Sequence, residues 1–416
     1  MRYLYSLLLY LLIPAVIARL LWRSRRAPAY RRRWAERFGF ITPLPVADVV
    51  WVHAVSVGET LAAAPLIKAL VARGVPVLVT TTTPTGSDRV RALFGNSVQH
   101  LYCPYDLPDA MRRFLRRTRP MLAIIMETEL WPNLFHVCAR EKIPLIVANA
   151  RMSERSARAY GRLASFTRAI LADVTLVAAQ GEADAARLRA LGARDVRVTG
   201  NIKFDLHLPA SLLEQAAVLR RAWGEDRLVW VAASTHAGED EQVLDAFARV
   251  RRAVPDCLLV LVPRHPERFD EVAALCRQCG YVLARRTDPG LGTLETAVFL
   301  VDRMGELPLF YAAGDVAFVG GSLVPTGGHN VLEPAALGKP VIVGPHTFNF
   351  LDITRQLLAA GGAVEIADAE QLTEAVLSYL ADANLRDAAG RKGRALVEQN
   401  RGALARLQTL LNEYLP

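Results

Sequence analysis

The 416-residue sequence lacks the motifs that identify most nucleotide hydrolases, dehydrogenases and metalloenzymes. No GxxxxGK[ST] run is present, which argues against a P-loop nucleotide hydrolase. A GxGxxG pattern starts at Gly290 and Gly292, but Glu295 stands where its last glycine should be, which weakens a dinucleotide oxidoreductase. Because HExxH and Asp-x-Asp are also missing, we expect neither a metal nor a resident cofactor.

Cysteine is scarce as well. The five cysteines are odd in number and spread along the chain, which disfavours a disulfide framework and favours a reducing compartment. Cys276 and Cys279 form one CxxC, but a closed zinc site needs about four ligands and no second pair exists. We interpret both as ordinary helix cysteines.

Lysine is rare, and the positive charge is concentrated at one end. Residues 1–40 contain nine Arg and one Glu, a net charge of +8 out of +9 for the whole chain. A nucleic-acid-binding protein would be expected to carry its basic surface on the folded domain, so we expect no nucleic-acid partner. Only five of the 50 basic residues are Lys, which indicates a general bias towards Arg and lowers the weight of any single Arg run.

An uncharged apolar stretch, residues 3–18, lies between Arg2 and Arg19. If Arg19 snorkels, about 20 helical residues would reach roughly 30 Å, one hydrocarbon thickness. A spanning anchor, a partly inserted helix and a cleaved signal peptide are the alternatives. The Arg-rich sequence that follows disfavours export. We therefore expect residues 1–27 to form a membrane-anchor helix with a basic flank that faces anionic lipid, the rest of the chain being cytoplasmic.

A second basic cluster follows Pro108 in a predicted short helix. Its spacing places guanidinium groups four residues apart on one surface. A solvated helix face and a surface for an acidic ligand or a membrane both fit this pattern. The cluster consists of Arg112, Arg113, Arg116, Arg117 and Arg119.

The remainder of the sequence reads as α/β. With 52% hydrophobic residues there is ample material for packed cores. Non-alternating Val, Ile and Leu runs separated by helical patterns are typical of parallel sheets buried on both faces. We expect two Rossmann-like, doubly wound domains facing across a cleft, residues 28–209 and 210–416, the second including the terminal helices. Predicted strands are 49–55, 76–82, 121–126, 144–149, 174–178, 228–233, 257–262, 297–301, 315–320 and 340–343.

The two halves open with similar turns. In each, a strand runs into a Ser, a Gly and then a Glu, at Glu59 and Glu239, before a helix begins. Open α/β sheets place ligands at the carboxyl ends of their strands. The Pro-containing stretch 205–211 is the expected hinge.

Three kinds of side chain in the first half are candidates for chemistry. Glu59 is either a helix N-terminal carboxylate favoured by the macrodipole or a general base. Glu127 and Glu129 follow an apolar strand and are either site residues or solvated loop residues. Side chains two positions apart face one way only in an extended chain, so we expect at most one of them to act, and we favour Glu129. Lys203, in an Asn-x-Lys-x-Asp turn, is either a surface lysine or a counter-charge for a phosphate or carboxylate.

In the second half, Arg264 follows a buried strand and could bind a phosphate in a fork. Gly305 permits close backbone approach at the start of another helix. The Gly-rich loop 320–328 leads to a helix and is predicted to form a phosphate cradle. Glu333 on that helix could accept hydrogen bonds from ribose hydroxyls. The combination indicates nucleotide-sugar binding.

The motifs, taken in order, resemble one family throughout the chain: the 3-deoxy-D-manno-octulosonic acid (Kdo) transferases of Gram-negative lipopolysaccharide synthesis. No motif position departs from the family pattern. The motifs are HAVSVGET (53–60), TTTPTGS (81–87), ETELWPN (127–133), NARMSERS (149–156), GNIKFD (200–205), PRHPER (263–268), MGE (304–306), GGSLVPTGGHNVLEPA (320–335) and GPHTFNF (344–350).

This resemblance implies a metal-independent GT-B glycosyltransferase that uses CMP-Kdo and a lipid A precursor at the cytoplasmic face of the inner membrane. It implies that Glu59 deprotonates the acceptor hydroxyl, and that Glu129 and Lys203 support the transition state. The residues that it implies for CMP binding are Pro263, Arg264, Met304, Gly305, Glu306, Asn330, Val331, Leu332 and Glu333.

Two other functions remain open at this point. One is a membrane-associated GT-B transferase that uses a UDP-sugar. The other is a non-catalytic, membrane-tethered protein that binds lipid or nucleotide. The sequence does not specify the number of Kdo residues added or the acyl chains tolerated.

Overall fold

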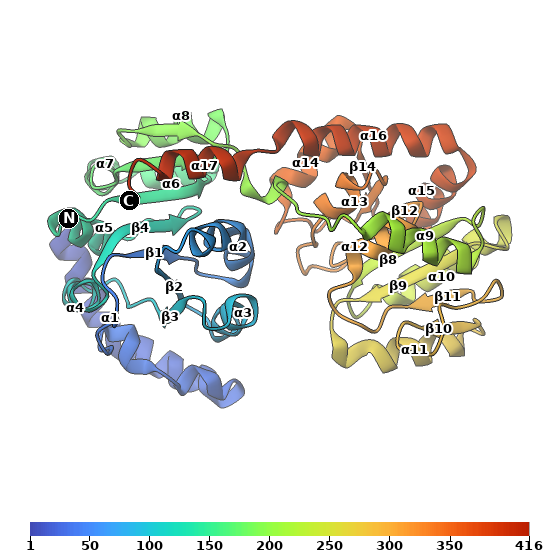
Figure 1. Cartoon of the computed structure of the whole chain (residues 1–416), viewed down its shortest axis with the longest axis horizontal. Helices are drawn as coiled ribbons and strands as arrows, with labels where there is room; N and C mark the ends of the chain where they lie inside the picture. The colour runs from blue at the N-terminus through green and yellow to red at the C-terminus, as the bar shows by residue number, and fades with distance from the viewer. Residues whose placement is uncertain (416) are drawn as a thin grey trace. The chain divides into compact units, whose positions relative to one another are not determined.

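The computed structural model describes residues 1–415, without the side chain of Arg26. It contains two compact units (Figure 1). Unit 1 comprises residues 1–205 together with the chain from residue 401 onward, and unit 2 comprises residues 206–400.

Unit 1 is built on a parallel sheet of seven strands in the order β3-β2-β1-β4-β5-β6-β7. The strands are β1 (Val49–His53), β2 (Val77–Thr81), β3 (Gln99–Tyr102), β4 (Pro120–Met126), β5 (Leu145–Ala150), β6 (Leu176–Ala179) and β7 (Val196–Val198). The helices are α1 (Arg2–Arg26), α2 (Val57–Ala72), α3 (Pro84–Phe94), α4 (Pro108–Thr118), α5 (Pro132–Arg140), α6 (Glu154–Gly161), α7 (Ala164–Leu171), α8 (Glu182–Leu191) and α17 (Ala403–Leu411), with 3₁₀ turns η1 (Pro28–Arg31), η2 (Trp34–Phe38) and η3 (Ile202–Phe204).

Unit 2 repeats the architecture, with the strand order β10-β11-β9-β8-β12-β13-β14. Its strands are β8 (Val229–Thr235), β9 (Leu258–Pro263), β10 (Leu283–Arg285), β11 (Val298–Leu300), β12 (Val316–Val319), β13 (Val341–Val343) and β14 (Ala363–Glu365). Its helices are α9 (Leu212–Trp223), α10 (Asp240–Ala253), α11 (Phe269–Gln278), α12 (Leu307–Ala313), α13 (Leu332–Ala336), α14 (Leu351–Ala360), α15 (Ala369–Ala381) and α16 (Ala383–Asn400), with the 3₁₀ turn η4 (Pro266–Arg268).

Strand β1 shows why these sequences form doubly covered sheets. All five of its residues are buried. Val49 and Trp51 belong to the apolar cluster on one face, and Val50 and Val52 belong to the cluster on the other. Because successive side chains of a strand point to opposite faces, an uninterrupted apolar run needs a layer of helices on both sides.

The division of the chain differs from the expected ranges at the C-terminus. Residues 210–416 were expected to form one domain, but α17 belongs to unit 1, where the red helix lies with the blue and green elements in Figure 1. Two contacts explain this position. Leu407 and Leu411 are fully buried in a cluster with Leu66 and Leu70 of α2, and the Asp205 carboxylate accepts the N–H groups at the start of α17.

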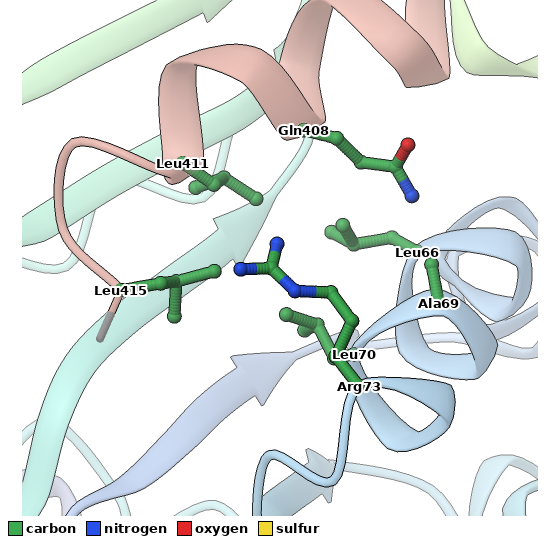
Figure 2. Close-up of a pocket in the computed structure, with 7 residues that line it drawn as sticks. All are labelled: Leu66, Ala69, Leu70, Arg73, Gln408, Leu411 and Leu415. Carbon is green, nitrogen blue, oxygen red and sulfur yellow. The ribbon is translucent and has the colours of Figure 1, made fainter.

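Figure 2 shows this packing between α2 and α17, with side chains from both helices facing one another around a small pocket. Leu66 and Leu70 come from α2, Arg73 directly follows that helix, and Leu411 comes from α17. Arg73 Nη1 also donates a hydrogen bond to Asn412 Oδ1 at 2.6 Å. Unit 1 is therefore completed by the end of the chain.

We expect the Leu411→Ala variant to destabilise unit 1 by about 2–5 kcal/mol, because the substitution opens a cavity in a closed core. Hydrogen exchange should accelerate in peptides that cover β1 and β4 and stay unchanged in those that cover β8. Leu385→Ala, at a 46% exposed position in α16, is the control. Equal changes in both units would contradict the assignment of α17.

Candidate active site

The candidate residues of unit 1 gather at the carboxyl ends of its strands. Glu59 follows β1, Glu127 and Glu129 follow β4, and Lys203 lies in η3, just after β7. Parallel strands end at the same edge of the sheet, so residues far apart in sequence meet there. All three residues expected to be catalytic lie at this edge.

Glu59 is held by a capping box at the start of α2. Its carboxylate accepts hydrogen bonds from the Val55 N–H (2.7 Å) and the Ser56 hydroxyl (3.2 Å), and its own N–H donates to Ser56 Oγ. Burial, together with the nearby charges of Glu127 and Glu129, raises the pKa of Glu59 to about 7, although these hydrogen bonds act to lower it. A carboxyl with this pKa can take up a proton near neutral pH.

Lys203 pairs with the carboxylate that sequence reasoning set aside. Its Nζ lies 3.2 Å from Glu127 Oε1, whereas Glu129 Oε2 accepts a hydrogen bond from Trp131 Nε1 at 2.7 Å. The two carboxylates therefore have separate partners, although both act on the pKa of Glu59. Glu127 therefore lies in the candidate site beside Lys203, although the sequence analysis favoured Glu129.

Backbone strain marks the same edge. Glu127 and Asn149, at the ends of β4 and β5, are non-glycine residues with φ of 56° and 55°. Such conformations cost about 1–3 kcal/mol and cluster at functional sites. The Asn149 Oδ1 accepts the Ile202 N–H at 3.1 Å, which fixes the turn that carries Lys203. The geometry at this edge is therefore imposed by the surrounding fold.

In unit 2 the loops that follow β8, β9 and β12 meet near Arg264. The Arg264 N–H donates to the Thr235 carbonyl. His236 Nε2 and His329 Nε2 are 2.8 Å apart with stacked rings, and the His265 ring meets His236 edge-on. Burial lowers the pKa of His329 to about 4 and also lowers the pKa of His236, with a further contribution from Arg264.

The three histidines were not selected as site residues from the sequence, although His265 and His329 lie within two of the motifs. With their pKa values lowered, His236 and His329 are neutral at neutral pH, so one ring nitrogen donates to the other. Arg264 and this neutral pair form a cationic, hydrogen-bonding surface suited to a phosphate.

The Gly-rich loop has a different role from the one expected. The N–H groups of Gly321, Ser322 and Leu323 all donate to the carboxylate of Glu239, at 2.6–2.9 Å, and the His236 N–H joins them at 3.0 Å. Glu239 is completely buried. These amides form an anion-binding nest that a residue of the protein already fills, so the expected phosphate cradle is not formed by residues 321–323.

The other residues expected in CMP binding are distributed along this edge. Asn330 Nδ2 donates to Glu333 Oε1 at 3.0 Å, and burial raises the pKa of the Glu333 carboxyl. Pro263 ends β9, and Val331 and Leu332 are buried at the start of α13.

Residues 304–306 lie beyond the next strand, β11. Met304 is 53% exposed, Gly305 adopts a φ of 92°, and Glu306 pairs with Arg286 at 2.8 Å. The strand order places β11, β9, β8 and β12 side by side.

The second basic cluster is largely structural. Arg113, Arg117 and Arg119 donate to backbone carbonyls of residues 38–44, which attaches that segment to α4. Arg116 remains exposed. Within residues 1–415, no group of three His, Cys, Asp or Glu side chains is arranged to hold a metal ion.

Comparison with known proteins defines the class. A model described as 3-deoxy-D-manno-octulosonic-acid transferase (kdotransferase) matches residues 32–206, and one for group 1 glycosyl transferases matches residues 292–396. The UDP-GlcNAc 2-epimerase of Neisseria meningitidis aligns with a TM-score of 0.56 at 15% identity, covering 88% of this chain and 100% of that structure. The protein is a glycosyltransferase with the GT-B fold.

Two relatives specify the family. The 3-deoxy-D-manno-octulosonic acid transferase of Haemophilus influenzae is 44% identical over 422 residues, with 100% of this chain and 99% of the relative covered. That of Bordetella pertussis is 42% identical, with 95% and 96% covered. The chain belongs to the Kdo transferases, which act in lipopolysaccharide biosynthesis.

We expect Glu239→Ala to destabilise unit 2 by about 3 kcal/mol or more, because each buried N–H left without a partner costs about 1–3 kcal/mol. Hydrogen exchange should accelerate in the 316–324 peptide while unit 1 is unaffected. Glu241→Ala, at an exposed position of α10, is the matched control. Unchanged exchange in the Glu239 variant would show that the nest does not depend on this carboxylate.

Proposed function

We propose that the enzyme transfers Kdo from CMP-Kdo to a hydroxyl of a lipid A precursor, lipid IVA, with inversion at the anomeric carbon and Glu59 as general base. The observation that carries this proposal is the position of Glu59. It is a partly buried carboxyl with a pKa of about 7, beside two carboxylates and a lysine, at the ligand-binding edge of unit 1.

The proposed chemistry uses Glu59 directly. Its carboxylate accepts the proton of the acceptor hydroxyl as the oxygen attacks the anomeric carbon and the CMP phosphate departs from the opposite face. Glu129 and Lys203 support the transition state in this proposal, and the ion pair between Lys203 and Glu127 holds the lysine in place.

Unit 2 supplies the donor site in this proposal. Pro263, Arg264, residues 304–306 and residues 330–333 bind CMP, and the Arg264 fork faces the phosphate. The leaving monophosphate develops less charge than a diphosphate would, so a guanidinium and neutral imidazole donors suffice to stabilise it. This is why we propose a reaction that needs no metal.

We also propose that the enzyme works at the cytoplasmic face of the inner membrane, where anionic lipids would be its partners. Within residues 1–415, one helix, Arg2–Arg25, is long and apolar enough to cross a membrane, with a mean hydropathy of 2.1. The arginines after it favour a cytoplasmic location of the following domains. The acceptor is itself a lipid, so a membrane location fits the proposed reaction.

Replacement of the proposed base gives the first test. We expect Glu59→Gln to lower kcat by about 10²–10⁴-fold, the usual contribution of general-base catalysis. CMP affinity should be unchanged, because the nucleotide site that we propose lies in unit 2. Glu154→Gln, on the surface of α6, is the control. Full turnover by Glu59→Gln would refute the assignment.

The pH dependence gives a second test. The carboxylate of Glu59 is the active form, so kcat/KM should fall as pH drops below about 7, where the raised pKa leaves most molecules protonated. Glu127→Gln should move this acidic limb to lower pH, because one of the negative charges that raise the pKa of Glu59 is removed. A limb that stays in place would exclude Glu59 as the titrating group.

Product analysis separates the alternative functions. Mass spectrometry of lipid IVA incubated with CMP-Kdo should show added Kdo and give the number of additions. Release of UDP from a UDP-sugar, with no reaction of CMP-Kdo, would favour the other transferase. No transfer from any donor by the wild-type enzyme would favour a non-catalytic binder.

A further inference from the structure

Helix α1 is fixed to the body of unit 1 by its first turns. The Tyr5 hydroxyl donates to Asp106 Oδ2 at 3.0 Å, and the Ser6 hydroxyl donates to Asn133 Oδ1 at 3.0 Å. Tyr10 adds a hydrogen bond to Asp109. Ser6 is 8% exposed although it lies in an otherwise apolar helix. These contacts join residues about a hundred positions apart in sequence.

The receiving site is rigid. Asp106 accepts the N–H groups of Asn133 (3.0 Å) and Leu134 (2.7 Å), and its own carbonyl accepts Asn133 Nδ2 at 2.7 Å. Asn133 is completely buried. Asp106 thus caps the first turn of α5. Tyr5 and Ser6 bind to Asp106 and Asn133, which these hydrogen bonds already hold in place.

The other end of α1 continues into a segment that is attached to unit 1. Ser24 Oγ, in a 3% exposed residue, accepts the Arg31 Nε at 2.8 Å, and the helix packs on η1. A few residues later, Arg37 Nη1 donates to the Thr82 carbonyl and Glu36 Oε2 accepts the Tyr102 N–H. Both ends of the helix are therefore held on the side of the membrane where unit 1 lies.

The outward face of the first half of α1 is apolar and uncovered. We call the exposed residues of this face the leucine face, and they include no charged side chain. The exposed fractions lie between 51% and 68%. Soluble monomers rarely expose a contiguous apolar surface of this kind without a binding role. The leucine face consists of Leu4, Leu7, Leu8, Leu11 and Leu12.

We propose that α1 does not cross the bilayer but lies in its interface, with the leucine face inserted into one leaflet. A 25-residue helix is about 37 Å long, so a crossing would move one end to the far side of the membrane and break one set of contacts with unit 1. An in-plane helix keeps both sets. The exposed Arg19, Arg23 and Arg25 then meet anionic headgroups.

This inference rests on the proposed membrane location and makes it specific. The length and apolarity of α1, which suggested a membrane-spanning helix, suit a helix that lies along the membrane surface equally well. The polar side chains on the inner face of the first turns decide between the two, because Tyr5 and Ser6 already have partners in the body of unit 1. The enzyme would then reach a lipid acceptor from one leaflet only.

The test measures the depth of α1 in vesicles of phosphatidylethanolamine and phosphatidylglycerol. Single cysteines replace Leu4, Leu8 or Leu12 in the full chain carrying Cys279→Ser, which removes the exposed native thiol, and each is labelled with an environment-sensitive fluorophore. We expect all three labels to be quenched more by a shallow nitroxide lipid than by a deep one. Val282→Cys, 56% exposed in unit 2, is the unquenched control.

A spanning helix would give another pattern. The label at residue 12 would be quenched best by the deep nitroxide, and a cysteine at residue 4 would react only with a thiol reagent trapped inside the vesicles. Either result overturns the proposal, as does failure of the chain to bind these vesicles. Activity is not the readout, so an inactive protein with a shallow α1 would refute the proposed function and leave this inference standing.

Vesicle binding by two matched variants, Leu8→Glu and Leu213→Glu, gives a second test. Leu8→Glu should weaken binding to the same vesicles about tenfold or more, because an apolar side chain leaves the leaflet and a charge replaces it. Leu213→Glu, at a 68% exposed position in unit 2, should leave binding unchanged. Equal loss in both variants would show that net charge, rather than insertion of the leucine face, controls binding.

Discussion

The burial of both faces of each parallel sheet is the constraint on which the rest of the structure depends. Strands such as β1 and β8 are buried along their whole length, and helices cover both sides. Polar side chains can therefore gather only where the strands end. Since parallel strands all end at one edge, a few short loops bring Glu59, Glu127 and Lys203 together, and others place Arg264 beside His329.

The sequence pattern predicted the central strands and missed the outer ones, because only central strands are buried along their whole length and therefore carry an apolar run. All of the expected strands are present, and the four that were missed, β3, β7, β10 and β14, each lie at the edge of a sheet. An edge strand is short and partly exposed, so its sequence, such as QHLY or VRV, has no apolar run. The return of α17 to unit 1 was also missed, because chain order does not show which core Leu407 and Leu411 complete.

The candidate site was predictable where residue type and position coincide. Glu59 lies in the turn after a predicted strand, and Lys203 is one of only five lysines in the chain. The structure places both at one edge of the sheet. The sequence spacing of Glu127 and Glu129 did not show which of them pairs with Lys203. Glu127 has a positive φ, and its carboxylate forms the ion pair. The histidines after β8 and β12 become neighbours only because those strands pair.

The two opening turns show how one local motif serves two purposes. Glu239 accepts four backbone N–H groups and is fully buried. Its carboxylate therefore holds the loop at residues 321–323 in place. Glu59 accepts only one backbone N–H and one hydroxyl, and it has two carboxylates nearby instead of a nest of amides. Donors stabilise the ionised form and neighbouring negative charges oppose it. The same Ser-Gly-Glu turn thus yields a carboxylate that holds a loop in unit 2 and, in the proposed mechanism, the carboxylate that accepts a proton in unit 1.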